Sequence, residues 1–195
     1  MDVHEIIHSF SYVAIFILMI TNGVINLPSS QLLYLVVGYF VSTGYLDFIT
    51  AVLVGAIGNT IGNILIFLVV KKYGKPIAQK ILFMDETTFG AIYGSLHATF
   101  SKRGMWYIFL GKIIPSIKAF IPILAGLAKT KNSQTFVLFF LSSCIWAMGI
   151  VMLGKIFGEH VSLTSLAGIS FVVGVTILFL VYKNVHKALA KTSKK

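Results

Sequence analysis

Long apolar runs separated by short polar or basic segments make up most of the 195-residue chain. Three of these runs contain no proline and have about the 20 residues that a helix needs to cross a hydrocarbon core ~30 Å thick. They predict membrane-spanning helices over 48–70, 136–154 and 163–182. The run at 9–25 predicts a further span, and the run at 32–46 is shorter.

The run at 105–127 is long enough to cross a membrane, but two prolines interrupt it, so a re-entrant hairpin competes with a full span. If this run enters and leaves on one side, thirteen basic residues share that side and Lys155 stands alone on the other. If it crosses, seven basic residues fall on each side. The positive-inside rule favours the first arrangement. We therefore expect 105–127 to enter from the cytoplasmic side, with Lys112 part-way down and Lys118 near the tip.

A fainter copy of this hairpin occurs earlier in the chain. The segment Leu27-Pro28-Ser29-Ser30 resembles Ile114-Pro115-Ser116, and an apolar arm that ends in glycine follows each. The spans after the two copies run in opposite directions, and inverted repeats of broken helices are typical of transporters, which bind their substrate where the copies meet. The sequence thus predicts an all-α membrane protein, a polytopic helical bundle with two re-entrant helical hairpins in an inverted repeat. Chance similarity between apolar segments is the alternative explanation.

Composition indicates an integral membrane protein. Hydrophobic residues make up 57% of the chain and charged residues 11%, and the mean hydropathy is +0.91. We expect residues 1–195 to form a single integral membrane domain with a basic cytoplasmic tail over 183–195. The net charge of +10 suits anionic lipid headgroups rather than nucleic acid, because the basic residues flank apolar runs. Cys144 is the single cysteine, so no intrachain disulfide forms.

Lys112 and Lys118 are the charges that fall inside an apolar run. On insertion scales each costs roughly 2.5–3.5 kcal/mol at the centre of a bilayer, so a negative partner is expected. All six acidic residues lie in or beside polar ends. We therefore expect a ligand, the phosphate of a lipid, to supply the negative charge. The alternative is that the lysine stems extend to the headgroup region and have no further role.

The turns of the two hairpins add backbone donors to this site. Proline suits the first position of a helix and serine its capping turn, so each turn presents unpaired N–H groups to its tip. Anions are favoured at such helix N-termini. The expected substrate-binding residues are Lys112, Lys118, Pro115, Ser116, Ser29, Ser30 and Gln31.

The run at 48–70 carries small and polar residues at helical spacing. Gly55, Gly58 and Gly62 form a face that permits the close approach of another helix. Asn59 and Asn63 lie at neighbouring positions. Helix packing is the favoured interpretation, and a polar path lined by the asparagines is the alternative.

Two other functions are alternatives to lipid transport. His4-Glu5-Ile6-Ile7-His8 matches the H-E-x-x-H zinc motif, which makes a zinc-dependent membrane protease an alternative. A catalytic zinc needs a third ligand and a shaped cavity; Glu159 and His160 fall on the opposite face in the expected topology, whereas His97, Asp85 and Glu86 remain possible on the same side. A polar cap on the first helix is favoured, and neither a metal nor another cofactor is expected. The second alternative is a membrane assembly factor without a transported substrate, whose buried lysines pair with acids of a partner.

The hairpin motif also resembles a known family. The segment Phe109-Leu-Gly-Lys-Ile-Ile-Pro-Ser-Ile-Lys118, followed by Ala125-Gly126, Phe136 and Trp146, is similar to the core of the DedA family, as are Gly55-Ala-Ile-Gly-Asn-Thr-Ile-Gly62 and Lys72-Tyr-Gly74. The resemblance covers about residues 10–160. It implies two re-entrant hairpins and the transport or scrambling of lipids, with undecaprenyl phosphate as the implied bacterial substrate.

The chain departs from this family in two respects. Lys112 and Lys118 stand where the family has arginines, which keeps the charge but loses the bidentate fork. Thr21 and Ser30, with Gln31 adjacent, stand where the family commonly has acids, so the proton coupling that the resemblance implies is in question.

Taken together, the sequence predicts a non-enzymatic, multi-pass plasma-membrane transporter or flippase. Its expected partners are an anionic lipid phosphate and the surrounding phospholipids, and self-association is left open.

Overall fold

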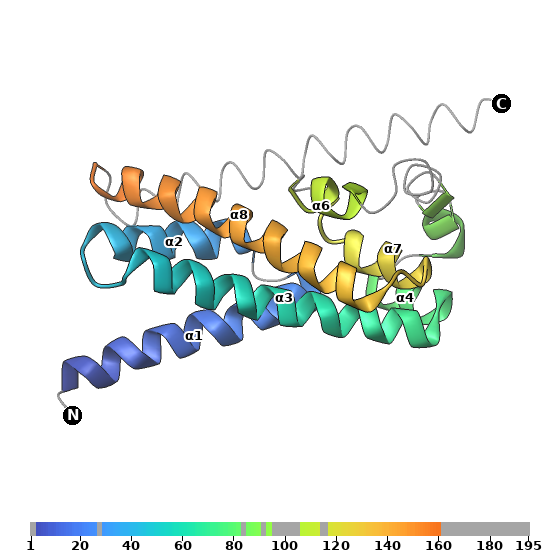
Figure 1. The fold of residues 1–195 in the computed structure, drawn as a ribbon, viewed down its shortest axis with the longest axis horizontal. Coiled ribbons are helices and arrows are strands. Elements are labelled where there is room, and N and C mark those ends of the chain that lie inside the picture. Colours follow the sequence, from blue (N-terminus) through green and yellow to red (C-terminus); the bar gives the residue numbers. More distant parts are fainter. Residues whose placement is uncertain are drawn as a thin grey trace.

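The computed structural model describes residues 3–26, 29–82, 85–90, 93–94, 106–113 and 117–160, with side chains from residue 10 onward and without that of Ile113. The labelled elements within these ranges are helices, which confirms the all-α prediction for this part of the chain (Figure 1). They are α1 (Val3–Ile25), α2 (Ser30–Ser42), α3 (Phe48–Tyr73), α4 (Lys75–Leu82), α6 (Trp106–Ile113), α7 (Ile121–Leu127) and α8 (Asn132–Gly158).

Two long antiparallel helices, α3 and α8, form the centre of the bundle (Figure 1). At 26 and 27 residues, each extends about 40 Å. Their mean hydropathies of 2.1 and 2.4 and their lengths suit a membrane crossing, as predicted for 48–70 and 136–154. Near one end, Phe67 of α3 makes edge-to-face contacts with Phe136 and Phe139 of α8. The third predicted span, 163–182, lies outside the described residues.

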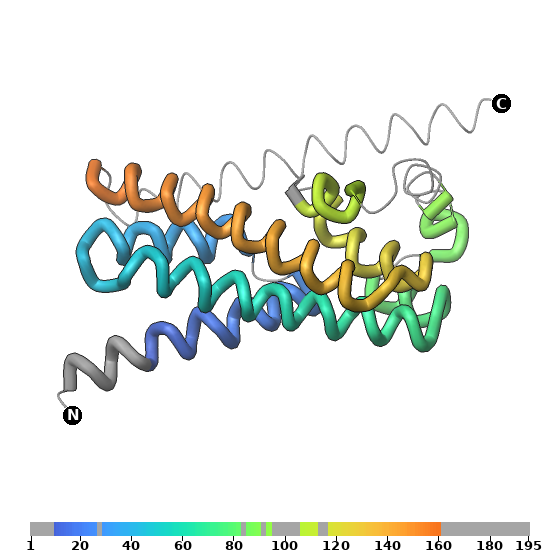
Figure 2. Tube along the Cα trace, in the orientation of Figure 1, coloured from blue at the N-terminus to red at the C-terminus, as the bar shows by residue number. Residues whose placement is uncertain are grey.

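The helices α1 and α2 extend along one half of this central pair only (Figure 2). Beside Phe48, Tyr12 Oη accepts a hydrogen bond of 2.9 Å from the Asp47 amide, whereas the inner end of α1 lies beside the middle of α3. Asn26 ends α1 in a left-handed conformation (φ 56°). The chain then returns as α2 along α8. The inner end of α1 therefore lies half-way along α3, and the span predicted at 9–25 stays a prediction.

The helices α6 and α7 extend along the other half. Gly126, near the end of α7, lies against the backbone of Phe67 and Lys71 in the last turns of α3. At the start of α6, Trp106 lies in a groove with Ser133 of α8. Both α6 and α7 therefore have their inner ends near the middle of the bundle and their outer ends where α3 ends and α8 begins.

Glycines set the distances between several of these helices. A Cβ atom on Gly38 of α2 would lie 2.3 Å from the carbonyl oxygen of Val151 in α8. A Cβ atom on Gly62 of α3 would lie 2.3 Å from the carbonyl oxygen of Ile20 in α1. Such small-residue contacts let helix backbones touch, as in membrane bundles. The predicted packing role of Gly62 is thus observed.

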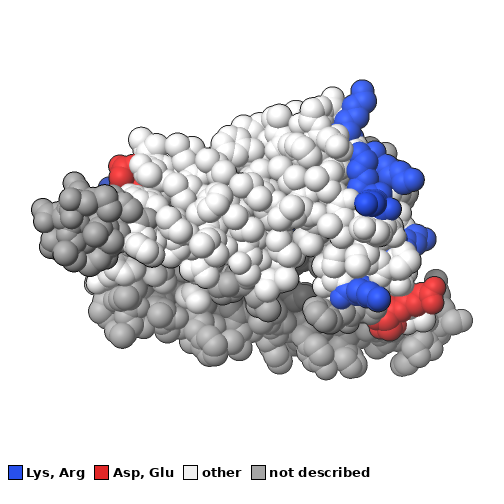
Figure 3. Space-filling model, turned by 90° about the horizontal axis from the view of Figure 1, so that it is seen from below, with Lys and Arg blue, Asp and Glu red and all other residues white. Residues whose placement is uncertain are grey.

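The outer surface of the bundle is apolar and its charges lie at the ends. Large apolar side chains such as Phe10, Ile49 and Ile145 are more than half exposed, which suits contact with lipid rather than water. Most of the described lysines lie at the end of the bundle where α3 ends and α8 begins (Figure 3). Lys71 Nζ donates hydrogen bonds of 2.6 Å to Thr130 O and 2.7 Å to Asn132 Oδ1 there. Lys155 lies at the opposite end, in the last turn of α8.

Candidate functional site

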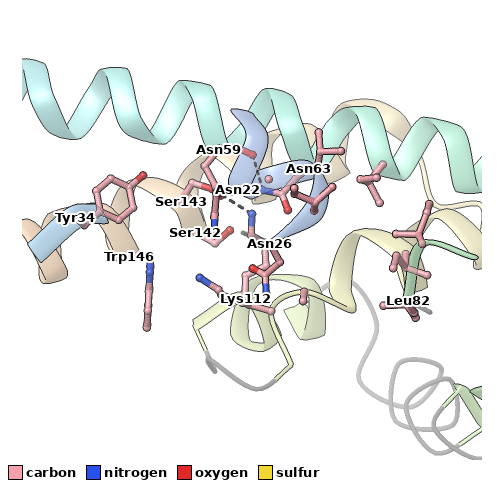
Figure 4. Close-up of a pocket in the computed structure, with 18 residues that line it drawn as sticks. Asn22, Asn26, Tyr34, Asn59, Asn63, Leu82, Lys112, Ser142, Ser143 and Trp146 are labelled. Atoms are coloured by element: carbon pink, nitrogen blue, oxygen red, sulfur yellow. Dashed lines mark hydrogen bonds between the residues drawn. The ribbon is translucent and has the colours of Figure 1, made fainter. Parts of the chain in front are cut away.

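A polar cavity of about 70 Å³ lies in the middle of the bundle, where the inner ends of both helix pairs meet α3 and α8 (Figure 4). A water molecule needs about 10–15 Å³ of such space, so the cavity is large enough for several waters or for a small polar group. Its polar lining consists of Asn22, Asn26, Tyr34, Asn59, Asn63, Lys112, Lys118, Ser142, Ser143 and Trp146. We call it the central cavity.

Lys112 reaches the central cavity from α6 and is only 5% exposed. Its ammonium group donates a hydrogen bond of 3.1 Å to Ser143 Oγ on α8 and lies 4.9 Å from the centroid of the Phe139 ring. A hydroxyl and an aromatic face are both neutral, so they stabilise the charge without cancelling it. The deep burial of Lys112 contradicts the alternative in which its stem extends to the headgroups.

Lys118 lies at the inner end of the same helix pair, in the turn before α7. Its ammonium group donates a hydrogen bond to Ser30 Oγ at the first residue of α2 and lies 5.3 Å from the centroid of the Trp146 ring. These partners are again neutral. The structure thus brings Lys112 and Lys118 to one cavity, as the sequence predicted, and adds Ser30 beside them.

A network of amides and hydroxyls continues from Lys112 across the bundle (Figure 4). Ser143 Oγ donates to Asn59 Oδ1 at 3.1 Å, and Asn59 Nδ2 donates to Asn22 Oδ1 at 3.0 Å. Asn63 Nδ2 also donates to Asn59 Oδ1, at 2.8 Å. Asn59 therefore joins α1, α3 and α8 at the wall of the cavity, and the polar path that the asparagines could line stays a prediction.

Two buried donors at the cavity have no hydrogen-bond partner within the described part of the chain. They are Tyr34 Oη on α2 and Trp146 Nε1 on α8. Tyr34 is 1% exposed, and its ring packs against Gly55 of α3, where a Cβ atom would lie 2.6 Å from Tyr34 Cε1. Buried polar groups in proteins are normally paired, so these two atoms require an explanation.

The electrostatic character of the central cavity follows from this inventory. None of the described residues that line it is acidic, while two lysines do line it. Coulomb interactions are stronger in such a low-dielectric interior than in water. The cavity therefore favours a small anion that accepts hydrogen bonds, such as a phosphate group.

The remaining predicted site residues are less central. Ser29 is exposed and donates a 2.5 Å hydrogen bond to Gln31 Oε1, and neither residue lines the cavity. Thr21 Oγ1 donates to Ile17 O at 3.0 Å within α1. Pro115 and Ser116 lie outside the described residues, so their predicted role at the tip is untested.

The zinc motif also falls where side chains are not described, since His4, Glu5 and His8 precede residue 10. Among the residues that are described, no group of three or more histidine, cysteine, aspartate or glutamate side chains could hold a metal ion. Asn22, Asn26, Tyr34 and the pair Ser142–Ser143 line the cavity but were not among the predicted site residues. Adjacent serines in the middle of an otherwise apolar span were the signal that could have revealed the last pair.

Comparison with known proteins gives one family match and several distant relatives. The VTT-domain model matches residues 27–156. A Bacillus subtilis (strain 168) protein named uncharacterized membrane protein YbfM is 26% identical over 165 residues, which cover 80% of this chain and 96% of the relative. Undecaprenyl phosphate transporter A of Staphylococcus aureus (strain NCTC 8325 / PS 47) is 23% identical over 163 residues, covering 77% of this chain and 76% of the relative.

A further relative bears a different kind of name. An alkaline phosphatase-like protein of Lactococcus lactis subsp. lactis (strain IL1403) is 27% identical over 167 residues, which cover 80% of this chain and 75% of the relative. No solved structure matches the chain significantly.

Proposed function

The chain belongs to the VTT-domain family of membrane proteins, also called the DedA family, and from this premise we propose that it is a transporter for an anionic lipid phosphate. In this proposal the central cavity binds the phosphate headgroup, and the protein moves that headgroup across the plasma membrane while the apolar tail stays in lipid. The relative named undecaprenyl phosphate transporter A suggests undecaprenyl phosphate as the substrate.

The observation that carries the proposal is the pair of lysines at the central cavity. Lys112 and Lys118 come from one helix pair, and within the described part of the chain their ammonium groups contact hydroxyls and aromatic rings. Two buried positive charges are costly unless a negative group offsets them. A phosphate monoester carries about 1.5 to 2 negative charges near neutral pH and accepts several hydrogen bonds, so it matches both requirements.

Helix pairing supports the inverted repeat of two re-entrant hairpins. The contacts of α1 with α3 correspond to those of α6 with α8, and the contacts of α2 with α8 correspond to those of α7 with α3. If α1, α2 and α3 are exchanged with α6, α7 and α8 in this order, each contacting pair of helices becomes the other pair. We propose that α1–α2 and α6–α7 enter the membrane from opposite faces and that their tips meet at its midplane, which is the usual location of a transporter site.

The distribution of charge supports an orientation. Lys71, Lys129 and Lys131 lie at the end of the bundle where α3 ends and α8 begins. Lys155 lies at the opposite end. By the positive-inside rule we propose that the first end is cytoplasmic. The basic segment 183–195 is proposed to lie on the same side, next to anionic phospholipids.

These features suggest how the headgroup passes. The hydrogen bond from Lys118 to Ser30 links the inner ends of the two hairpins. A phosphate that binds Lys118 competes with Ser30 for the ammonium group and so weakens the contact between the tips. The headgroup then leaves toward the opposite face of the membrane, while the positive charge of Lys112 stays at the central cavity.

Binding and transport in proteoliposomes test this proposal. Purified protein should bind a polyprenyl phosphate, and it should accelerate the movement of a fluorescent analogue between leaflets, measured as protection from a membrane-impermeant quencher. The double variant Lys112→Ala/Lys118→Ala should lose both activities, and Lys112→Arg/Lys118→Arg should retain binding. Unchanged binding by the alanine double variant would refute the proposal.

The alkaline phosphatase-like name of one relative raises hydrolysis as a competing activity. We propose transport without chemical change, because a phosphatase needs a nucleophile or a metal-activated water, and the described cavity lining offers lysines, amides and hydroxyls with no carboxylate beside them. Measuring inorganic phosphate released from polyprenyl phosphate separates the two activities. Phosphate release that is lost on Ser143→Ala would favour the enzyme.

A further inference from the structure

Tyr34 and Trp146 occupy matched positions at the central cavity, next to the contacts of the two lysines. On α2, Tyr34 lies one turn after Ser30, which accepts the hydrogen bond of Lys118. On α8, Trp146 lies three residues after Ser143, which accepts the hydrogen bond of Lys112. Residues three or four apart share one helix face. Both aromatic residues therefore lie on the face of their helix that already holds a lysine contact.

The polar atoms of both aromatic residues are buried without a partner in the described structure. Both residues line the cavity, and the indole ring of Trp146 lies within 5.3 Å of the Lys118 ammonium group. A buried donor that lacks an acceptor costs free energy, and neither lysine at the cavity can accept a hydrogen bond from the phenol or the indole. Two ammonium groups, a phenol and an indole N–H thus line one cavity, and the phenol and the indole have no hydrogen-bond partner among the described residues.

We propose that Tyr34 Oη and Trp146 Nε1 donate hydrogen bonds to the phosphate group that Lys112 and Lys118 attract. This inference rests on the proposed function and adds to it two neutral residues that determine specificity. A phosphate offers several acceptor oxygens, so it satisfies both lysines and both aromatic donors together. Charge attracts the anion, and the neutral donors orient it, because the Tyr34 ring is held against Gly55 of α3 and the Trp146 ring lies beside the Lys118 ammonium group.

Gly55 explains how the tyrosine is held against the cavity wall. A Cβ atom there would lie 2.6 Å from Tyr34 Cε1 and 3.1 Å from Tyr34 Oη. The absence of a side chain on Gly55 therefore gives the phenol ring its position between α2 and α3. This provides a role for Gly55 beyond helix packing.

The deciding experiment uses Tyr34→Phe, which removes the hydroxyl and keeps the ring. Full-length protein in liposomes should bind polyprenyl phosphate about tenfold more weakly, because a hydrogen bond to a charged group is lost. Its melting temperature without ligand should not fall, because the hydroxyl has no protein partner to lose. Tyr39→Phe, on the same helix but away from the cavity, is the matched control and should leave affinity unchanged.

Trp146 supplies an independent readout. The chain has two tryptophans, and Trp106 is 71% exposed and does not line the central cavity. In a Trp106→Phe background, the emission of Trp146 should change on adding polyprenyl phosphate, and the change should saturate at the concentration where binding saturates. Trp146→Phe should weaken binding about tenfold, measured by retention of labelled lipid. Should that variant fail to fold, Tyr34→Phe still decides the proposal.

Two sources could supply the phosphate, so the titration is repeated with inorganic phosphate alone. A similar loss for both ligands in Tyr34→Phe indicates contact with the phosphate group itself. A loss confined to polyprenyl phosphate would place the hydroxyl against another part of the lipid and overturn the inference. Normal affinity in both aromatic variants, with binding abolished in Lys112→Ala/Lys118→Ala, would overturn the inference and leave the proposed function standing. An absence of phosphate binding in the wild-type protein would overturn both.

Discussion

Lys118 and Ser30 are separated by 88 residues, yet the Lys118 ammonium group donates a hydrogen bond to the Ser30 hydroxyl where the inner ends of the two helix pairs meet. Ser30 is 1% exposed, and its hydroxyl accepts the hydrogen bond of the partly buried Lys118 ammonium group. The contact joins two segments that otherwise pack on different long helices. We therefore expect this contact to affect both the stability of the protein without ligand and its affinity for an anion.

We expect Ser30→Ala to lower the melting temperature of the empty protein and to increase the shift that a polyprenyl phosphate produces. The reason is that the substitution removes an acceptor from a buried charge, which costs roughly 1–3 kcal/mol, and an incoming phosphate restores it. Thermal unfolding with and without ligand measures both effects. Ser29→Ala, at the exposed neighbouring position, should leave both values unchanged. An unaltered ligand shift in Ser30→Ala would contradict the expected competition between Ser30 and phosphate.

Lys112→Met should stabilise the empty protein while abolishing binding. Methionine approximates the lysine stem, and replacing a buried charge removes a desolvation penalty. Each kcal/mol gained should raise the melting temperature by about 2–4 °C in a chain of this size. Lys131→Met, at an exposed position before α8, is the control and should change neither property. A clear loss of stability in Lys112→Met would mean that the ammonium group serves mainly as a structural donor to Ser143.

Gly38→Ala should destabilise the bundle because its Cβ atom would lie 2.3 Å from Val151 O, which forces α2 away from α8. We expect a cost of several kcal/mol, since backbone rather than a flexible side chain must move. Gly149→Ala is the matched control within α8, where nothing lies within 4 Å of the added atom. It should be neutral or stabilising by up to about 1 kcal/mol through helix propensity. Equal melting temperatures for the two variants would argue against the observed contact between α2 and α8.

Cysteine labelling tests the proposed orientation. In a Cys144→Ser background, Lys131→Cys and Lys155→Cys should react with an impermeant thiol reagent from opposite faces of the membrane. Positions 131 and 155 are 24 residues apart along α8, a rise of about 36 Å, which exceeds a ~30 Å hydrocarbon core. Lys72→Cys should react from the same face as Lys131→Cys. Labelling of positions 131 and 155 from one face would exclude α8 as a span.

Sequence reasoning identified the long spans and the two buried lysines because both rest on strong local signals. A proline-free apolar run predicts a membrane helix, and a lysine within an apolar run is rare enough to indicate function. The end of α1 at Ile25 matches the end of the apolar run at 9–25, but the sequence did not show that this end lies half-way along α3.

Ser30 was predicted to share a site with the lysines, whereas their partners on α8 were not predicted. Ser143 and Trp146 lie on the face of α8 that turns toward α6 and α2, and the sequence of one apolar helix does not reveal which face meets which neighbour. Likewise, Tyr34 reads as an ordinary aromatic residue of a membrane helix. Its significance depends on Gly55, which lies on another helix and leaves the ring its space.

Both charged residues that line the described central cavity are positive, which also affects whether cations can leak through the protein. At an effective dielectric constant near 20, a unit charge repels a like charge 4 Å away by about 4 kcal/mol. Sodium ions and hydronium ions should therefore be kept from the opening that admits an anionic headgroup, and the ion gradients across the membrane should survive its operation. Proteoliposomes with Lys112→Met/Lys118→Met should dissipate a pH gradient faster than wild-type ones, and equal leak rates would contradict this electrostatic barrier.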